Sequence, residues 1–222
     1  MQIQFVLSYF AIQSTFNMKQ KEQYIDEIKA IRQMMEQSSR FLSLSGLSGV
    51  LIGIYALIGA YWVNHLIENN SVIQDNLVKQ ILILAIIVLT GSLITVIVLT
   101  YRKTITDGHK IWNKGTRLLV LNLAVPLLTG AVFNGILISR GLYEMVAATL
   151  LIFYGLALVN AAKYTRLEIY YMGLFQVVIG IIAALLPGYA LLLWALGFGV
   201  IHVLYGTIMH YRYDRYYKTE KP

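Results

Sequence analysis

Long apolar segments separated by short polar ones dominate the chain. Six of them approach the roughly 20 residues that a helix needs to cross a bilayer: about 42–64, 77–100, 118–138, 144–162, 169–186 and 189–210. A helix is the expected conformation, because every backbone amide in lipid must form its hydrogen bond within its own segment. The pattern therefore predicts an all-α, polytopic membrane protein with six transmembrane helices.

The connections between these segments predict how the helices pair. The links at 139–143 and at the Pro187-Gly188 turn are short, and short links make consecutive helices antiparallel neighbours. We therefore expect residues 42–211 to form one transmembrane domain of three helical hairpins. A weak similarity between residues 46–59 and 173–186 also suggests an internal repeat, since both segments would enter the membrane from the same side.

Both ends of the chain are more polar. Ile28, Ile31, Met35 and Leu42 follow a three-then-four spacing with charges between them, which predicts an amphipathic helix over residues 18–41. It can lie on the membrane surface, pack on the protein's own loops or pair with a second copy. Residues 1–17 lack the basic start and cleavage site of a signal peptide, so we expect a disordered or upstream extension.

Composition narrows the functional class. Hydrophobic residues make up 58% of the 222-residue chain and charged residues only 13%, too few to cover a soluble domain. The absence of cysteine excludes disulfides, thiol nucleophiles and Cys-ligated metals. His202 and His210 are too far apart in sequence for a metal pair on one helix face. We expect no metal, no cofactor and no enzymatic activity.

The basic residues predict the orientation in the membrane. The N-terminal segment and the link between the second and third spans have five Lys or Arg each, the link between the fourth and fifth spans has two, and the tail 212–222 has four. The opposite side has only Lys79 and Arg140. The positive-inside rule then places both termini in the cytoplasm. We expect the protein to lie in the inner (plasma) membrane of the cell. The net charge of +7 is therefore interpreted as attraction to anionic lipids rather than to nucleic acid.

Uncharged polar residues gather in the cytoplasmic half of the predicted spans. Counting from the cytoplasmic helix ends places them about 3 to 12 Å deep, and only Asn134 lies near the outer side. The candidate polar cluster consists of Ser48, Asn122, Asn160, Gln176 and His202. Such groups either bond across helices and fix their packing or line a small cavity open to the cytoplasm.

Small residues predict where helices approach each other. Ser45, Gly49 and Gly53 recur at every fourth position of the first span, and Gly199 and Gly206 give the last span a similar narrow side. Small residues allow membrane helices to pack closely. We therefore expect the first span to contact the last.

The string Gly46-Leu-Ser48-Gly49 resembles the GxSG string that carries the nucleophilic serine of rhomboid intramembrane proteases. In that family the serine begins the fourth span and the histidine lies in the sixth, whereas Ser48 is in the first span here. No histidine and asparagine on an earlier span supply an oxyanion hole. We interpret the string as coincidental.

The first span, "RFLSLSGLSGVLIGIYALIGAY", resembles that of a family of small bacterial integral membrane proteins with no known activity, over residues 18–64. The resemblance implies a membrane protein and no mechanism. The leading hypothesis is a scaffold, partner subunit or membrane regulator that acts through its cytoplasmic face, as a homo-oligomer or with another membrane protein. The alternatives are a small transporter or channel that uses the polar cluster, and an intramembrane serine hydrolase.

Overall fold

The computed structural model describes residues 20–21, 24–29, 31, 45–70, 75–106, 112 and 114–214. The chain divides into two units, residues 1–40 and 41–222. In the first unit the described residues are helical, as expected for the amphipathic segment, and Lys29 Nζ lies 3.3 Å from Asp26 Oδ1. Met35, Leu42 and residues 1–17 lie outside the described residues.

Among the described residues of the second unit, six helices are long and apolar enough to cross a membrane. The first three are α2 (Gly46–Glu68), α3 (Asp75–Thr106) and α4 (Lys114–Ser139). The fourth span is α5 (Val146–Ala161) between single turns at Tyr143–Met145 and Ala162–Tyr164, and the fifth is α6 (Leu167–Leu185). These helices confirm the all-α, polytopic fold.

The sixth span is made of several segments. It begins with a turn at Pro187–Tyr189 and α7 (Ala190–Trp194), widens into a π-helical segment at Ala195–Ile201, and continues as α8 (His202–Met209). A second π-helical segment, His210–Asp214, carries the helix into the region expected to be a tail. The remaining tail residues, 215–222, lie outside the described residues.

Several helices extend beyond their predicted ends. The 32 residues of α3 span about 48 Å, more than the ~30 Å of hydrocarbon in a bilayer. Its last turns, with Arg102 and Lys103, therefore leave the lipid as helix. Hydropathy marks only the part of a helix that contacts lipid, so the polar turns at its ends were missed.

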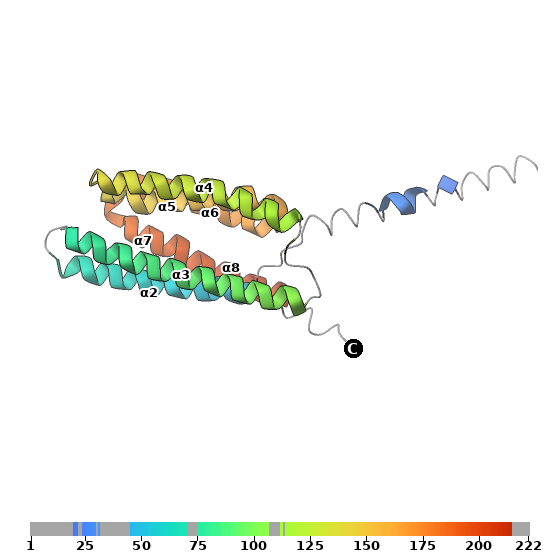
Figure 1. Ribbon diagram of the computed structural model, residues 1–222, viewed down its shortest axis with the longest axis horizontal. Helices are drawn as coiled ribbons and strands as arrows, with labels where there is room; N and C mark the ends of the chain where they lie inside the picture. Colours follow the sequence, from blue (N-terminus) through green and yellow to red (C-terminus); the bar gives the residue numbers. More distant parts are fainter. Residues whose placement is uncertain are drawn as a thin grey trace, which may run out of the picture. The chain divides into compact units, whose positions relative to one another are not determined.

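The six spans form two layers of three helices (Figure 1). In one layer, α2 packs between α3 and α8; in the other, α5 packs between α4 and α6. The last span starts against α5 and α6 at α7 and ends against α2 at α8. The third hairpin is thus antiparallel as expected, but its two helices pack on different partners: α6 on α5, and α8 on α2.

The contact between α2 and the last span depends on glycine. A Cβ atom on Gly53 would lie 2.6 Å from the Gly199 carbonyl oxygen, and one on Gly49 would lie 3.0 Å from the Gly206 Cα. These neighbours are backbone atoms, which cannot rotate away as a side chain would. The expected contact between the first and last spans is therefore present, and it brings two backbones together. Ser45 lies just before α2, as its N-cap residue.

A second seam of the same construction holds α5 against α6. A Cβ atom on Gly155 would lie 2.6 Å from the Gly173 carbonyl oxygen and 2.8 Å from the Val177 amide nitrogen. In the first seam, Gly206 faces the corresponding atoms, the Gly46 carbonyl and the Val50 amide. Gly46 and Val50 align with Gly173 and Val177 in the similarity between residues 46–59 and 173–186. The similar segments thus make equivalent antiparallel contacts, one in each layer.

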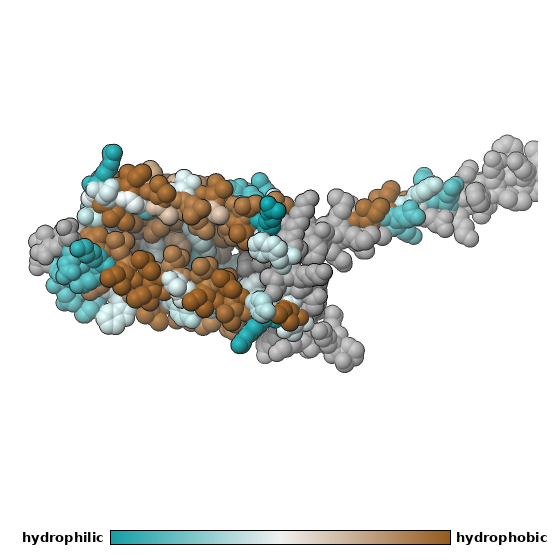
Figure 2. All heavy atoms as spheres, viewed as in Figure 1, coloured by the Kyte–Doolittle hydropathy of each residue, from teal (hydrophilic) through white to brown (hydrophobic). Residues whose placement is uncertain are grey.

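Apolar side chains cover much of both layers on the face that Figure 2 shows. The buried apolar core is small and joins α5, α6 and the last span: Ala148, Leu151, Ile179 and Ala183, with Trp194 and Phe198 packed against them. Among the six spans, α3 is the most exposed to lipid, since its most apolar stretch has no buried residue. Close backbone packing at the glycine seams therefore contributes much of what holds the helices together, because lipid is as apolar as the side chains facing it.

The seam can be tested with glycine substitutions. Gly206→Val forces a side chain against the backbone of α2, and we expect it to lower the free energy of unfolding in mixed detergent micelles by about 1–3 kcal/mol. Gly135→Ala is the control, since no atom lies within 4 Å of a Cβ atom there, and it should leave stability unchanged or slightly raised. Equal effects of the two substitutions would contradict this account of the α2–α8 contact.

Candidate functional site

The π-helical segment of the last span contains Gly197, which lies directly against α5 and α6. A Cβ atom on Gly197 would meet the Leu151 side chain and would lie 2.5 Å from Gln176 Oε1. Single π-helical turns interrupt α-helices most often at functional sites. This segment is therefore the first place to look for chemistry in the membrane-spanning unit.

The Gly197 carbonyl oxygen accepts hydrogen bonds from two side chains. Gln176 Nε2 donates from α6 at 2.8 Å, and His202 Nδ1 lies 3.1 Å from the same oxygen. His202 must therefore carry its proton on Nδ1 to donate here. Its Nε2 is then an acceptor, and the Tyr154 hydroxyl donates to it from α5 at 2.8 Å. We call these four residues the Gly197 node.

Aromatic rings enclose the node on the side of the last span. Phe198 stacks on the His202 ring with centroids 5.9 Å apart and planes at 12°, and its centroid lies 4.8 Å from that of Tyr154. Trp194 extends the row by one helical turn, 5.1 Å from Phe198. These rings hold the imidazole in the orientation that its two hydrogen bonds require.

The node is closely packed. Gln176 is fully buried and His202 is 3% exposed. Gln176 Oε1 has no hydrogen-bond partner among the described residues, and it faces the Cα of Gly197, where a weak Cα–H···O contact can partly satisfy it. The geometry is that of a structural clamp between layers, since Gln176 and His202 bond to one carbonyl and Tyr154 of α5 bonds to His202.

The predicted polar cluster divides in the structure. Gln176 and His202 meet at the Gly197 node, but Asn122 Nδ2 donates to the Leu118 carbonyl of its own helix at 2.8 Å. Asn160 is half-buried near the end of α5. The structure thus joins Gln176 to His202 and gives Asn122 a partner on its own helix, since counting residues gives depth along a helix and not the direction in which a side chain points.

Ser48 lies nearer to the helix end than expected. It is the third residue of α2, because the helix begins at Gly46, and its hydroxyl donates to the Ser45 carbonyl at 2.6 Å. The ring nitrogens of His202 bond to Gly197 and Tyr154. Within the described residues, Ser48 and His202 therefore form no nucleophile–base pair, as the interpretation of the GxSG string as coincidental requires.

The predicted cluster omitted Tyr154 and the Gly197 carbonyl. A tyrosine in the middle of an apolar span, away from headgroup depth, was the available signal for Tyr154. The carbonyl has no sequence signal, since it depends on the π-helical turn. Asn134, the outer polar residue, also bonds between helices: Thr149 Oγ1 of α5 donates to its Oδ1 at 2.6 Å.

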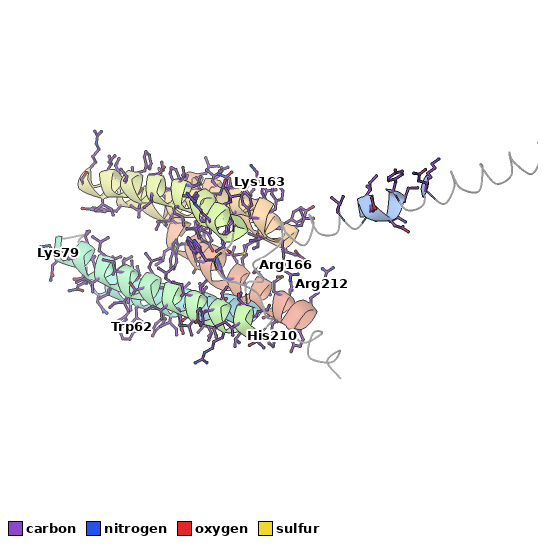
Figure 3. The ribbon with its side chains drawn as sticks, turned by 45° about the vertical axis from the view of Figure 1, so that its right-hand side comes forward. Trp62, Lys79, Lys163, Arg166, His210 and Arg212 are labelled. Carbon is purple, nitrogen blue, oxygen red and sulfur yellow. The ribbon has the colours of Figure 1, made fainter. Side chains whose placement is uncertain are left out.

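A second group of functional side chains lies at one end of the unit, which we call the basic end and which carries Lys163, Arg166 and Arg212 (Figure 3). Arg212 Nη1 lies 3.7 Å from Glu168 Oε1, which joins the end of the last span to the start of α6. Exposed tyrosines accompany these bases: Tyr170, Tyr171 and Tyr211. Within the described residues, no group of three or more His, Cys, Asp or Glu residues could hold a metal ion.

The hydrogen bond between Tyr154 and His202 predicts a measurable coupling. Tyr154→Phe removes the donor and leaves a buried ring nitrogen without its partner. We expect the free energies of unfolding of Tyr154→Phe, His202→Phe and the double variant to give a coupling energy of about 0.6–1.7 kcal/mol. Additive effects of the two substitutions would show that the bond does not stabilise the contact between α5 and the last span.

A functional assignment rests on this geometry, because comparisons with known proteins found no match. No protein-family description matches the chain, and neither a curated protein nor a solved structure is found to be significantly similar to it. The membrane class follows from the six apolar helices.

Proposed function

We propose that this multi-pass membrane protein is a non-enzymatic scaffold or partner subunit whose basic end lies in the cytoplasm and binds another membrane protein or a second copy of the chain. The observation that carries the proposal is the presence of both exposed tyrosines and arginines at that end. Tyr and Arg are the residues that most often dominate binding energy in protein interfaces. Anionic headgroups of the cytoplasmic leaflet would surround this surface.

The distribution of charge supports the orientation. Lys163 and Arg212 lie at the basic end, whereas Lys79 lies at the opposite one (Figure 3). Arg102 lies at the other end of α3 from Lys79, and Arg140 directly follows α4. Basic residues beside spans are retained on the cytoplasmic side. We infer that the connections at Asn69–Asn70 and Arg140–Leu142 face away from the cytoplasm.

The rigidity of the basic end supports a docking role. Tyr171 is 53% exposed and Tyr211 is 59% exposed, yet both are on helices whose backbones are fixed. The Arg212–Glu168 ion pair joins α6 to the last span, and a Cβ atom on Gly46 would clash with the backbone of His210. A surface held in place before binding loses less conformational entropy when a partner docks.

The alternatives receive less support from the geometry. A transporter needs a hydrated path past its polar groups, but Gln176 is fully buried against Gly197. Close packing there favours a structural role. An intramembrane hydrolase needs a base beside its serine, whereas the Ser48 hydroxyl bonds to Ser45.

The orientation can be tested with single cysteines, because the chain has none of its own. We expect a membrane-impermeant maleimide to label Arg140→Cys in intact cells and to label Lys163→Cys only after the membrane is permeabilised. Labelling of both variants in intact cells, or the reverse pattern, would contradict a cytoplasmic basic end.

The docking surface can be tested by affinity capture after chemical cross-linking in native membranes. The wild-type protein should recover a partner or a second copy, and Tyr171→Ala should reduce the recovery at least tenfold, as expected for an interface anchor. Tyr189→Ala is the matched control, since Tyr189 is similarly exposed but lies at the opposite end. Recovery of neither a partner nor a second copy with the wild-type protein would refute the proposal.

A further inference from the structure

A groove of about 320 Å³ lies between α2 and α3 in the half of the unit away from the basic end. Its walls are apolar apart from one amide: Trp62 and Leu66 on α2, and Gln80, Ile83, Leu84 and Ile87 on α3. The helices touch at Gly59, where a Cβ atom would lie 3.0 Å from Val88 Cγ2. Beyond that contact the groove opens toward the helix ends.

The polar end of the groove carries donors without protein partners. Lys79 lies one turn before Ile83 on α3, and Gln80 is in the wall itself. Neither side chain forms a hydrogen bond or ion pair within the part of the chain that the structure describes. In contrast, the polar groups at the end of α2 are used locally: Asn64 donates to Glu68 at 2.8 Å, and Asn69 lies 3.1 Å from His65 Nε2.

We propose that this groove is a binding site for one acyl chain of an anionic phospholipid, with the phosphate held by Lys79 and Gln80. From Gln80 to Ile87 the groove runs about 10 Å along the membrane normal, within the ~15 Å hydrocarbon depth of one leaflet. The Lys79 ammonium, labelled in Figure 3, complements the negative phosphate, and the Trp62 ring forms part of the groove wall that the acyl chain would contact.

The occupant is identified by this combination of groups. A transmembrane helix of a partner would cover Ile83 and Ile87, but it need not bring a negative charge to Lys79. A free anion would engage Lys79 and leave the apolar walls unfilled. A phospholipid satisfies both features at once, and the site does not depend on the proposed docking role of the basic end.

The site can be tested by fluorescence quenching from brominated acyl chains. Trp112→Phe and Trp194→Phe leave Trp62 as the only tryptophan in the full chain. Vesicles contain phosphatidylglycerol and phosphatidylcholine, with bromine on one lipid or on the other. We expect Trp62 to prefer phosphatidylglycerol about fivefold over its mole fraction, and Lys79→Gln to remove that preference. Arg140→Gln, which alters the other base of the same membrane side, should leave it unchanged.

Three results would overturn the proposal. Quenching that follows mole fraction with Lys79 in place would show ordinary lipid contact, and an unchanged preference in Lys79→Gln would show that Lys79 does not hold the phosphate. Rapid disulfide dimers of Gln80→Cys in membranes would show that a second copy occupies the groove. Native mass spectrometry of the wild-type protein and Lys79→Gln provides a readout that needs no tryptophan substitutions: retained anionic phospholipid should be lost in the variant.

Discussion

The direct approach of backbone to backbone at glycine is the interaction on which this structure depends. In lipid, an apolar side chain gains little by turning from acyl chains to another helix, so stable association needs closer contact than side chains permit. Gly206 against Gly46, and Gly155 against Gly173, provide that contact once in each layer. Each layer is therefore organised around one antiparallel pair, with α3 and α4 added on the outside.

The Gly197 node connects the two layers, whereas each glycine seam holds helices together within one layer. The last span leaves one layer and enters the other, and the π-helical segment lies at this crossing. Glycine at 197 allows the close approach of α5 and α6, because a side chain there would meet those of Leu151 and Gln176. The hydrogen bonds of Gln176 and His202 to one carbonyl then fix the rotation of the last span about its axis, which its apolar surface alone could not specify.

Much of the fold could be predicted from the sequence, because lipid imposes a simple rule on helix length and composition. The glycine spacing of the first span also predicted its contact with the last. The partner of α6 could not be predicted in the same way, since the Pro187-Gly188 turn fixes how two helices begin and not how they continue. For the site, the estimated depth of each residue in the membrane was enough to predict that Gln176 and His202 lie close together. The same estimate also included Asn122, whose side chain bonds within its own helix. Tyr154 was not predicted, because its role depends on the hydrogen bond to His202 on another span.

The pairing of the first span with the last has a consequence for how the protein is made. Ribosomes deliver spans to the membrane in order, so α2 is inserted first, and four further spans are made before its partner α8. Until then the glycine face of α2 has only lipid or the insertion machinery to cover it. The α5–α6 seam, by contrast, closes between consecutive spans. One layer can thus assemble as soon as α6 is made, whereas the other waits for α8, and truncation before α8 would leave a protein whose first helix has lost its principal contact.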